Sequence, residues 1–353
     1  MYALPTDVHE LEQLIPQTLE RREQVRSAYR LCLEAEGATN KPREKLNARI
    51  AGYLILYPLN ETARHKIVVD VISGRSFATI YRIGDFYLKF LFCAFKKAKS
   101  STPASSHRPS RPSFDMTAEA LRETLKTAPQ SHKDAKKQAS EFFLFFTPPN
   151  LTKKWDDATV KENPESDLYM QLTRDPTKKV PTECAHIFGE YTNADIDTKA
   201  NKCDYGANVW TVLTYFGHPE ILEQLNGAKV HSLENVMTLE QTLHGWFDNL
   251  QVWFEETPVP NQYRLVFAHA MDKALYPEIV TFSQAPGFEH LPLPSPLYLK
   301  IQAACAKVAH LSGAADFIDQ VYEDSEEMGV LASDGSSSTT LEYVLAGMTE
   351  SKA

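Results

Sequence analysis

Apolar side chains recur about every 3.6 residues through the first quarter of the chain, the spacing that places them on one face of an α-helix. The first such stretch ends at Gly37, a residue type that commonly follows a helix, and Pro16 is expected to kink or offset it. Further helical stretches follow at residues 43–57, 60–73 and 77–98. We therefore expect an all-α unit over residues 1–95.

Residues 96–116 have a different composition, because proline, serine and basic side chains replace the apolar ones. Such a stretch cannot bury enough apolar surface to fold and is typical of a linker or surface arm. Its basic side chains could still contact phosphates, although a solvated linker is the favoured interpretation. They are Lys96, Lys97, Lys99, Arg108, Arg111 and, when protonated, His107.

The rest of the chain mixes helical and strand-like patterns. Residues 117–145 and 295–322 have helical spacing, whereas residues 168–173, 183–188 and 250–256 are short β-like runs and residues 207–217 and 238–250 are helical. We predict an α+β fold, mainly α, in four segments. These are a helical N-terminal domain (1–95), a Pro/Ser/basic linker (96–116), a central module with an insertion (117–265) and a helical C-terminal segment (266–353).

Composition excludes several classes of protein. No apolar run approaches the roughly 18 residues of a membrane span, and the N-terminus lacks the basic-then-apolar layout of a signal peptide. The five cysteines form no C-x-x-C pair, which argues against a disulfide framework and a cysteine-based zinc site. We therefore expect an intracellular protein, in the cytoplasm or nucleus. The net charge of −9 means that any contact with nucleic acid needs a local basic cluster.

Two histidines and an asparagine stand out in the central module. His186 lies in the strand-like run "ECAHIF", and Asn235 and His244 lie in "LENVMTLEQTLHGWFD". Hydrolysis of a phosphodiester needs a general base and a metal that neutralises phosphate charge, and two histidines can supply the base and a ligand. Asp248 shares a helix face with His244, so it could orient that imidazole or ligate directly. The alternative is two hydrogen-bonded core histidines and a turn asparagine.

The combination "ECAHIF … LNGAKVHSLENVMTLEQTLHGWFD" resembles the HNH endonuclease family, specifically the HNH-domain proteins of mushroom-forming fungi. The stretches "TPASSHRPSRPSFD" and "LPLPSPLYLKIQAACAKVAHLSGAADFID" resemble segments that flank the HNH module there. The resemblance implies a ββα-metal finger within residues 169–250, embedded between helical segments. It also implies His186 as general base, His244 as metal ligand and Asn235 as the loop-fixing or metal-contacting residue.

The expected metal site departs from the family pattern at one position. Many HNH nucleases have a metal-binding aspartate directly before the catalytic histidine, and this chain has Ala185 there. Asp248 or Glu183 could compensate, although strand alternation points Glu183 away from His186. The predicted ligands are therefore His244, Asn235 and Asp248. We expect Mg²⁺, which keeps several waters and uses substrate phosphates, with Zn²⁺ or Mn²⁺ as alternatives.

Three further residues are predicted to contact substrate. They are His231, in the loop that leads to Asn235, and Lys178 and Lys179, which belong to a basic group that flanks the finger. The expected function is a metal-dependent endonuclease acting on nucleic acid, with no membrane association. Two alternatives stay open from the sequence. One is an enzyme that acts on a small molecule in the same pocket, and the other is a non-catalytic relic that binds a protein partner.

Overall fold

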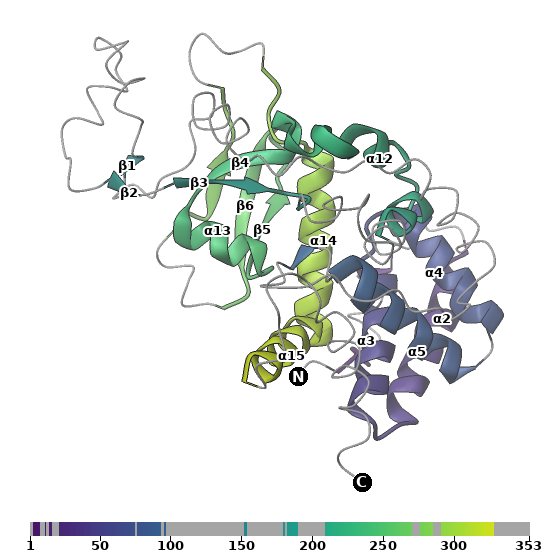
Figure 1. Ribbon diagram of the computed structural model, residues 1–353. Coiled ribbons are helices and arrows are strands. Elements are labelled where there is room, and N and C mark those ends of the chain that lie inside the picture. Colours follow the sequence, from purple (N-terminus) through teal and green to yellow (C-terminus); the bar gives the residue numbers. More distant parts are fainter. Residues whose placement is uncertain are drawn as a thin grey trace, which may run out of the picture. The chain divides into compact units, whose positions relative to one another are not determined.

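In a computed structural model of the chain, the described residues are 3–7, 11, 14–15, 21–74, 76–92, 95–96, 152–153, 179–180, 182–189, 209–269, 276–284 and 291–327 (Figure 1). They form helices and three small sheets, an α+β fold that is mainly α, as predicted. Several predictions lie outside these residues. They are the linker after Lys96, the helix over 117–145, the strand over 168–173 and the elements after residue 327. No helix in the described ranges is both long and apolar enough to cross a membrane.

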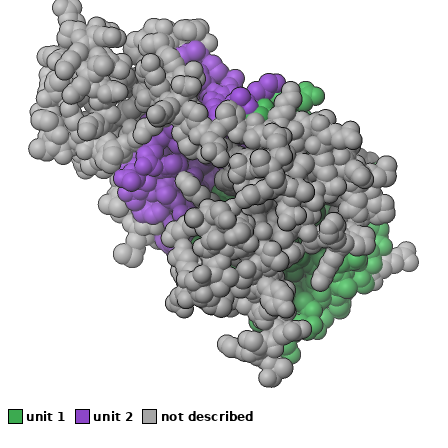
Figure 2. Space-filling model, viewed as in Figure 1, with its two compact units in different colours: residues 1–128, 191–227, 304–353 green, residues 129–190, 228–303 purple. Residues whose placement is uncertain are grey.

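The chain divides into two compact units, each discontinuous in sequence (Figure 2). Unit 1 comprises residues 1–128, 191–227 and 304–353, and unit 2 comprises residues 129–190 and 228–303. Residues 191–227 lie inside the predicted central module but group with unit 1. The predicted segments describe composition along the chain, whereas the units reflect contacts between segments that are distant in sequence.

Unit 1 is a helical assembly. Its N-terminal part contains α2 (Arg22–Gly37), α3 (Pro42–Leu56), α4 (Glu61–Gly74), α5 (Phe77–Tyr87) and a π-helical turn (Leu88–Phe92). Pro42 begins α3 at a position where a missing N–H costs nothing, and Ser76 caps α5 by accepting a hydrogen bond from Thr79 N at 3.2 Å. α3 is the central helix, because nearly every residue from Leu46 to Leu56 is buried.

A glycine permits a close helix contact in unit 1. A Cβ at Gly84 in α5 would lie 2.1 Å from the carbonyl oxygen of Asn47 in α3. No side chain fits at that separation, so this crossing of α3 and α5 requires glycine. Unit 1 also contains a helical stretch that ends at Tyr215, α12 (Glu220–Leu225), the part of α14 (Pro296–Ser312) from residue 304 onward, and α15 (Ala314–Glu327).

Two sequence-based expectations for this unit need correction. Lys96 was expected in a solvated linker, but its side chain is 1% exposed, and Nζ donates to Ala315 O at 2.9 Å and lies 2.6 Å from Asp319 Oδ2. It is therefore a buried ion-pair partner and is not available to phosphates. The expected single helix over 295–322 is two helices, α14 (Pro296–Ser312) and α15, separated by Gly313 at φ 83°. Glycine adopts this left-handed conformation without strain and so ends α14.

Unit 2 contains the small sheets. β3 (Thr182–His186) pairs antiparallel with β4 (Val236–Glu240), and α13 (Gln241–Asp248) follows β4 directly and contacts both strands. A second sheet contains β5 (Val252–Glu256), β6 (Gln262–Phe267) and β7 (Ile279–Thr281), all antiparallel. A third, parallel pair is β1 (Thr152–Lys153) with β2 (Lys179–Val180).

Two parts of unit 2 differ from the sequence prediction. Residues 238–240 were expected to be helical but belong to β4, all of whose residues are buried. A short fully buried strand has no alternating pattern that distinguishes it from a helix. The segment 266–353 was expected to be helical, yet it contains the end of β6 and all of β7. The turn between β5 and β6 depends on Asn261, which adopts φ 57°, a conformation that asparagine tolerates well.

Candidate functional site

The pairing of β3 with β4 determines where the candidate residues lie. His186 is the last residue of β3 and pairs with Val236, the first residue of β4. Because side chains alternate along a strand, Cys184 and His186 lie on one face of β3, and Glu183 and Ala185 lie on the other. The two faces of β3 therefore carry different polar groups.

The imidazole of His186 is buried and contacts a second histidine. His186 is only 8% exposed, and its ring atom Nε2 lies 3.0 Å from Nδ1 of His231. The two rings meet edge to face, with centroids 5.1 Å apart. His231 ends the 3₁₀ turn Gly227–His231, in the loop before β4. This hydrogen bond fixes the orientation of the His186 ring.

Asn235 is fully buried and bonds only to backbone groups in the described structure. Its Oδ1 accepts from Phe188 N at 2.9 Å, and its Nδ2 donates to Phe188 O at 2.9 Å and to Val230 O at 2.8 Å. The backbone carbonyl of Asn235 also accepts from Ile187 N at 2.9 Å. The amide therefore joins the chain after β3 to the loop before β4, which favours the loop-fixing role over metal contact.

Glu240 positions the helix that carries His244. As the N-cap of α13, its carboxylate accepts from Thr242 N at 2.9 Å and Leu243 N at 3.0 Å, and Tyr276 donates its hydroxyl to it at 2.9 Å. Burial by itself would raise the pKa of the Glu240 carboxyl, but these hydrogen bonds outweigh burial and hold the pKa below the ordinary value. The charged carboxylate is thus the form that caps the helix.

His244 lies between two carboxylates. Nδ1 is 2.8 Å from Oε2 of Glu183 on β3, and Nε2 is 3.3 Å from Oδ2 of Asp248, one turn further along α13. The His244 and Asp248 side chains are mostly buried, whereas that of Glu183 is 41% exposed. Glu183 points away from His186, as alternation predicts, and α13 places His244 on that same face.

The structure therefore groups the predicted residues into two clusters rather than one. His186 pairs with His231, and His244 pairs with Glu183 and Asp248. Glu183 and His186 are three residues apart on β3, which is about 10 Å along an extended strand. Within the described ranges, no three histidine, cysteine, aspartate or glutamate side chains converge on one metal-sized point.

Little can be said of the two lysines that are predicted to contact substrate. Lys178 is outside the described residues. Lys179 is in β2, where its backbone pairs with Thr152, and only its backbone is described.

Comparison with known protein families finds a similarity in this region. Residues 170–255 match the model of a family described as HNH endonuclease. These residues are called the HNH segment below, after this match. It contains β3, β4 and α13, and with them His186, Asn235 and His244. No curated protein and no solved structure matches the chain at a significant level.

Two residues of the HNH segment have contacts that sequence reasoning did not anticipate. Glu183 was discounted because it faces away from His186, yet it contacts His244. His231, which is predicted to bind substrate, contacts His186. Both contacts join positions far apart in sequence. A signal for Glu183 was nevertheless present, because a glutamate on a short apolar strand is unusual unless it has a partner.

Proposed function

We propose that the HNH segment is the catalytic part of a metal-dependent endonuclease and that β3, β4 and α13 form its ββα-metal finger. One observation carries this proposal. Residues 170–255, which match the family model, contain a strand–strand–helix unit, and the three candidate residues lie within its span. His186 ends the first strand, Asn235 precedes the second, and His244 is on the helix.

In this proposal His186 is the general base. If His231 Nδ1 accepts the proton of His186 Nε2–H, the basic lone pair of His186 is on Nδ1, where it can take a proton from the attacking water. His231 then stabilises the imidazolium that forms. We therefore assign His231 to the orientation of the base rather than to substrate binding. Asn235 keeps the end of β3 in place through its three backbone hydrogen bonds.

The residues around His244 fit a divalent cation. A histidine that ligates a metal commonly donates its other ring N–H to a carboxylate, which is what Glu183 offers at Nδ1. Nε2 is then the ligating nitrogen, since its contact with Asp248 is the longer of the two. One imidazole with carboxylate oxygens suits Mg²⁺ or Mn²⁺ better than Zn²⁺, which takes three or four firm nitrogen or sulfur ligands. Such an ion would neutralise charge on the scissile phosphate.

Asn235 was also predicted to ligate the metal. Its Oδ1 holds Phe188 N, and the whole side chain is buried, so ligation would break a buried hydrogen bond. We propose Asp248 and His244 as the ligands from this chain, with waters and substrate oxygens completing the shell.

The substrate of this enzyme is proposed to be nucleic acid. The chain has a net charge of −9, so phosphate contacts must come from a local cluster, and Lys178 and Lys179 before β3 are the proposed source. When the logarithm of the binding constant is plotted against the logarithm of the salt concentration, each phosphate contact to a duplex makes the slope more negative by about 0.9. The test is titration of labelled duplex and single strand with the full chain at several salt concentrations, with Mg²⁺ present.

The expected result is binding that weakens steeply with salt. The double change Lys178→Glu with Lys179→Glu should weaken binding and flatten the slope. Lys300→Glu is the matched control, because Lys300 is on α14, outside the HNH segment, and lies only 3.7 Å from Glu256. No detectable binding at low salt, where charges are least screened, would count against a nucleic-acid substrate.

A further inference from the structure

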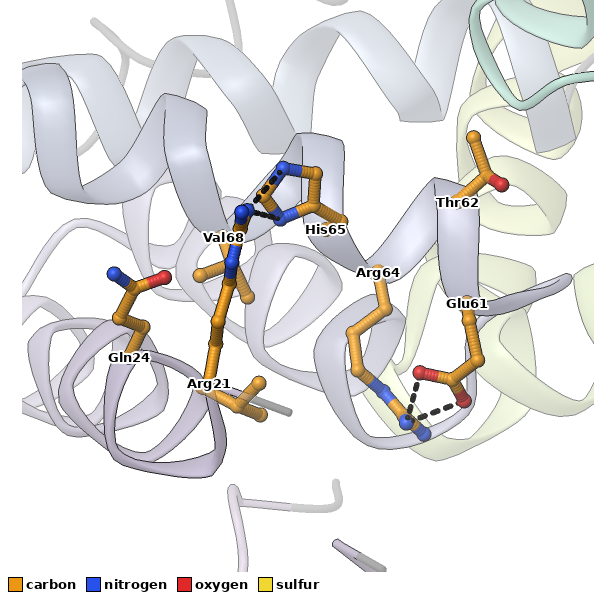
Figure 3. A pocket seen from close by; sticks show the side chains of 8 residues that line it. Arg21, Gln24, Glu61, Thr62, Arg64, His65 and Val68 are labelled. Atoms are coloured by element: carbon orange, nitrogen blue, oxygen red, sulfur yellow. Dashed lines mark hydrogen bonds and ion pairs between the residues drawn. The ribbon is translucent and has the colours of Figure 1, made fainter. Parts of the chain in front are cut away.

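Unit 1 contains a cavity whose lining residues lie outside the HNH segment. Its volume is about 360 Å³, and it lies at the N-terminal turns of α2 and α4 (Figure 3). Cavities of about 300 to 1,000 Å³ are typical of small-molecule sites. The residues that line it are Arg21, Gln24, Val25, Glu61, Thr62, Arg64, His65 and Val68.

One wall of the cavity carries the guanidinium of Arg21. Arg21 Nη1 lies 3.0 Å from His65 Nε2 and 3.4 Å from His65 Nδ1 (Figure 3). A guanidinium only donates hydrogen bonds, so the imidazole must accept here and is neutral in this pairing. In the part of the chain that the structure describes, no carboxylate pairs with Arg21. Its positive charge is therefore available to a ligand.

The opposite wall has a second guanidinium that is held rigidly. The Arg64 side chain is 6% exposed, Nε donates to Ile55 O at 3.0 Å, and Nη1 donates to both carboxylate oxygens of Glu61 at 2.6 and 2.8 Å. Its Nη2 makes no hydrogen bond to any residue in the described ranges. A buried guanidinium with an unused nitrogen in a cavity wall is a preorganised donor for a ligand acceptor.

The charges of the lining favour an anion that also has hydroxyl groups. Arg21 and Arg64 are positive and Glu61 is negative, so the lining is positive even with His65 neutral. The N-terminal turns of α2 and α4 each add partial positive charge from the helix dipole. A guanidinium fork matches phosphate oxygens, whereas the Glu61 carboxylate accepts from hydroxyls.

We propose that this cavity binds a sugar phosphate, the chemistry that nucleoside monophosphates share with simpler pentose phosphates. The phosphate group contacts Arg21 and His65. The sugar hydroxyls lie toward Glu61 and Arg64, where they meet both an acceptor and a donor. This site is independent of the nuclease activity proposed above, because every residue that lines it belongs to unit 1.

Calorimetric titration of the full chain tests the site with four probes: a nucleoside monophosphate, ribose 5-phosphate, the unphosphorylated nucleoside and inorganic phosphate. We expect saturable binding of both sugar phosphates, at least tenfold tighter than inorganic phosphate, and none of the nucleoside. A nucleoside monophosphate that binds much more tightly than ribose 5-phosphate identifies a nucleotide as the ligand. Inorganic phosphate that binds as tightly as the sugar phosphates contradicts the sugar contacts.

Variants locate the binding in this cavity. Arg21→Gln and His65→Gln should each weaken sugar-phosphate binding about tenfold or more, and Glu61→Gln should remove the preference over inorganic phosphate. Arg82→Gln is the matched control, since Arg82 is an exposed arginine on α5 that does not line the cavity. Circular dichroism confirms that each variant folds. Unchanged binding in Arg21→Gln and His65→Gln, or no saturable binding by the parent chain, overturns the proposal.

Discussion

Nδ1 of His244 lies 2.8 Å from Oε2 of Glu183, so a strand and the helix that packs on it are joined by an imidazole–carboxylate contact. Directly before the histidine proposed as general base, where HNH nucleases often have an aspartate, this chain has Ala185, which is fully buried. The carboxylate on this face of β3 is instead two residues earlier, at Glu183. In the proposed site, Glu183 takes the place of an acidic side chain at position 185.

Glu183→Gln should weaken the affinity for the metal rather than abolish activity. Loss of a carboxylate that orients a metal-ligating histidine typically costs about 10- to 100-fold in metal affinity or activity. We therefore expect the Mg²⁺ concentration for half-maximal cleavage to rise by about that factor, with turnover near the parent value at saturating metal. Glu256→Gln, at the end of β5, is the control. A metal dependence that is identical in the parent and Glu183→Gln would remove Glu183 from the site.

Asn235→Ala should destabilise unit 2. The change removes a buried amide that makes three backbone hydrogen bonds, and each group left without that partner costs about 1 to 3 kcal/mol. Allowing for relaxation, we expect the free energy of unfolding to fall by about 3 kcal/mol in urea denaturation. Asn249→Ala, which removes an exposed side chain with one bond to Gly245 O, should cost much less. Equal losses in the two variants would contradict the loop-fixing role.

Stability of unit 2 should depend on the charge of Glu240. The folded-state pKa of this carboxyl is below its ordinary value of 4.5, so its contribution is present above that pH and is lost as the pH falls through the folded-state pKa. At neutral pH, Glu240→Gln should lower the free energy of unfolding by about 1 kcal/mol, the usual scale of a helix cap. The difference from the parent should shrink below about pH 4.5. Glu278→Gln, at an exposed glutamate before β7, is the control variant.

His231→Ala should reduce turnover without changing substrate affinity. Its imidazole bonds to Nε2 of His186, and misplacement of a catalytic group typically costs about 10- to 100-fold in rate. We expect kcat to fall by about that factor while KM stays unchanged, and His231→Asn, which keeps an acceptor near the position of Nδ1, to recover part of the loss. His269→Ala, a change at an exposed histidine of the same unit, should have no effect. A rise in KM with normal kcat would restore the substrate-binding role that the sequence suggested.

Much of the helical architecture could be predicted from sequence, because it depends on local signals. Gly37 ends α2, and predicted helices at 43–57 and 60–73 correspond to α3 and α4 within one residue at each end. The strand that carries His186 was also visible as a short apolar run. In each case the residues that decide the structure lie within a few positions of one another.

The remaining features depend on contacts between distant segments. The residues that follow Lys96 in sequence have the composition of a linker. The carbonyl and carboxylate that bind its buried ammonium group come from α15, more than 200 residues away. Residues 238–240 of β4 were mistaken for helix because their identity as a strand comes from pairing with β3. The same limit applies to the site. Alternation gave the direction of Glu183 correctly but could not show that α13 would bring His244 to that face.

Metal-dependent cleavage is the most direct test of the central claim. The full chain is incubated with labelled duplex DNA and single-stranded RNA, with Mg²⁺, with Mn²⁺, and with a chelator, alongside His186→Ala and the control His269→Ala. We expect cleavage that requires the metal, is lost with the chelator, falls by about 10² to 10⁴ in His186→Ala and is unchanged in His269→Ala. Absence of cleavage of both substrates with either metal, or equal cleavage by the parent and His186→Ala, would contradict the assignment of an HNH nuclease site to this chain.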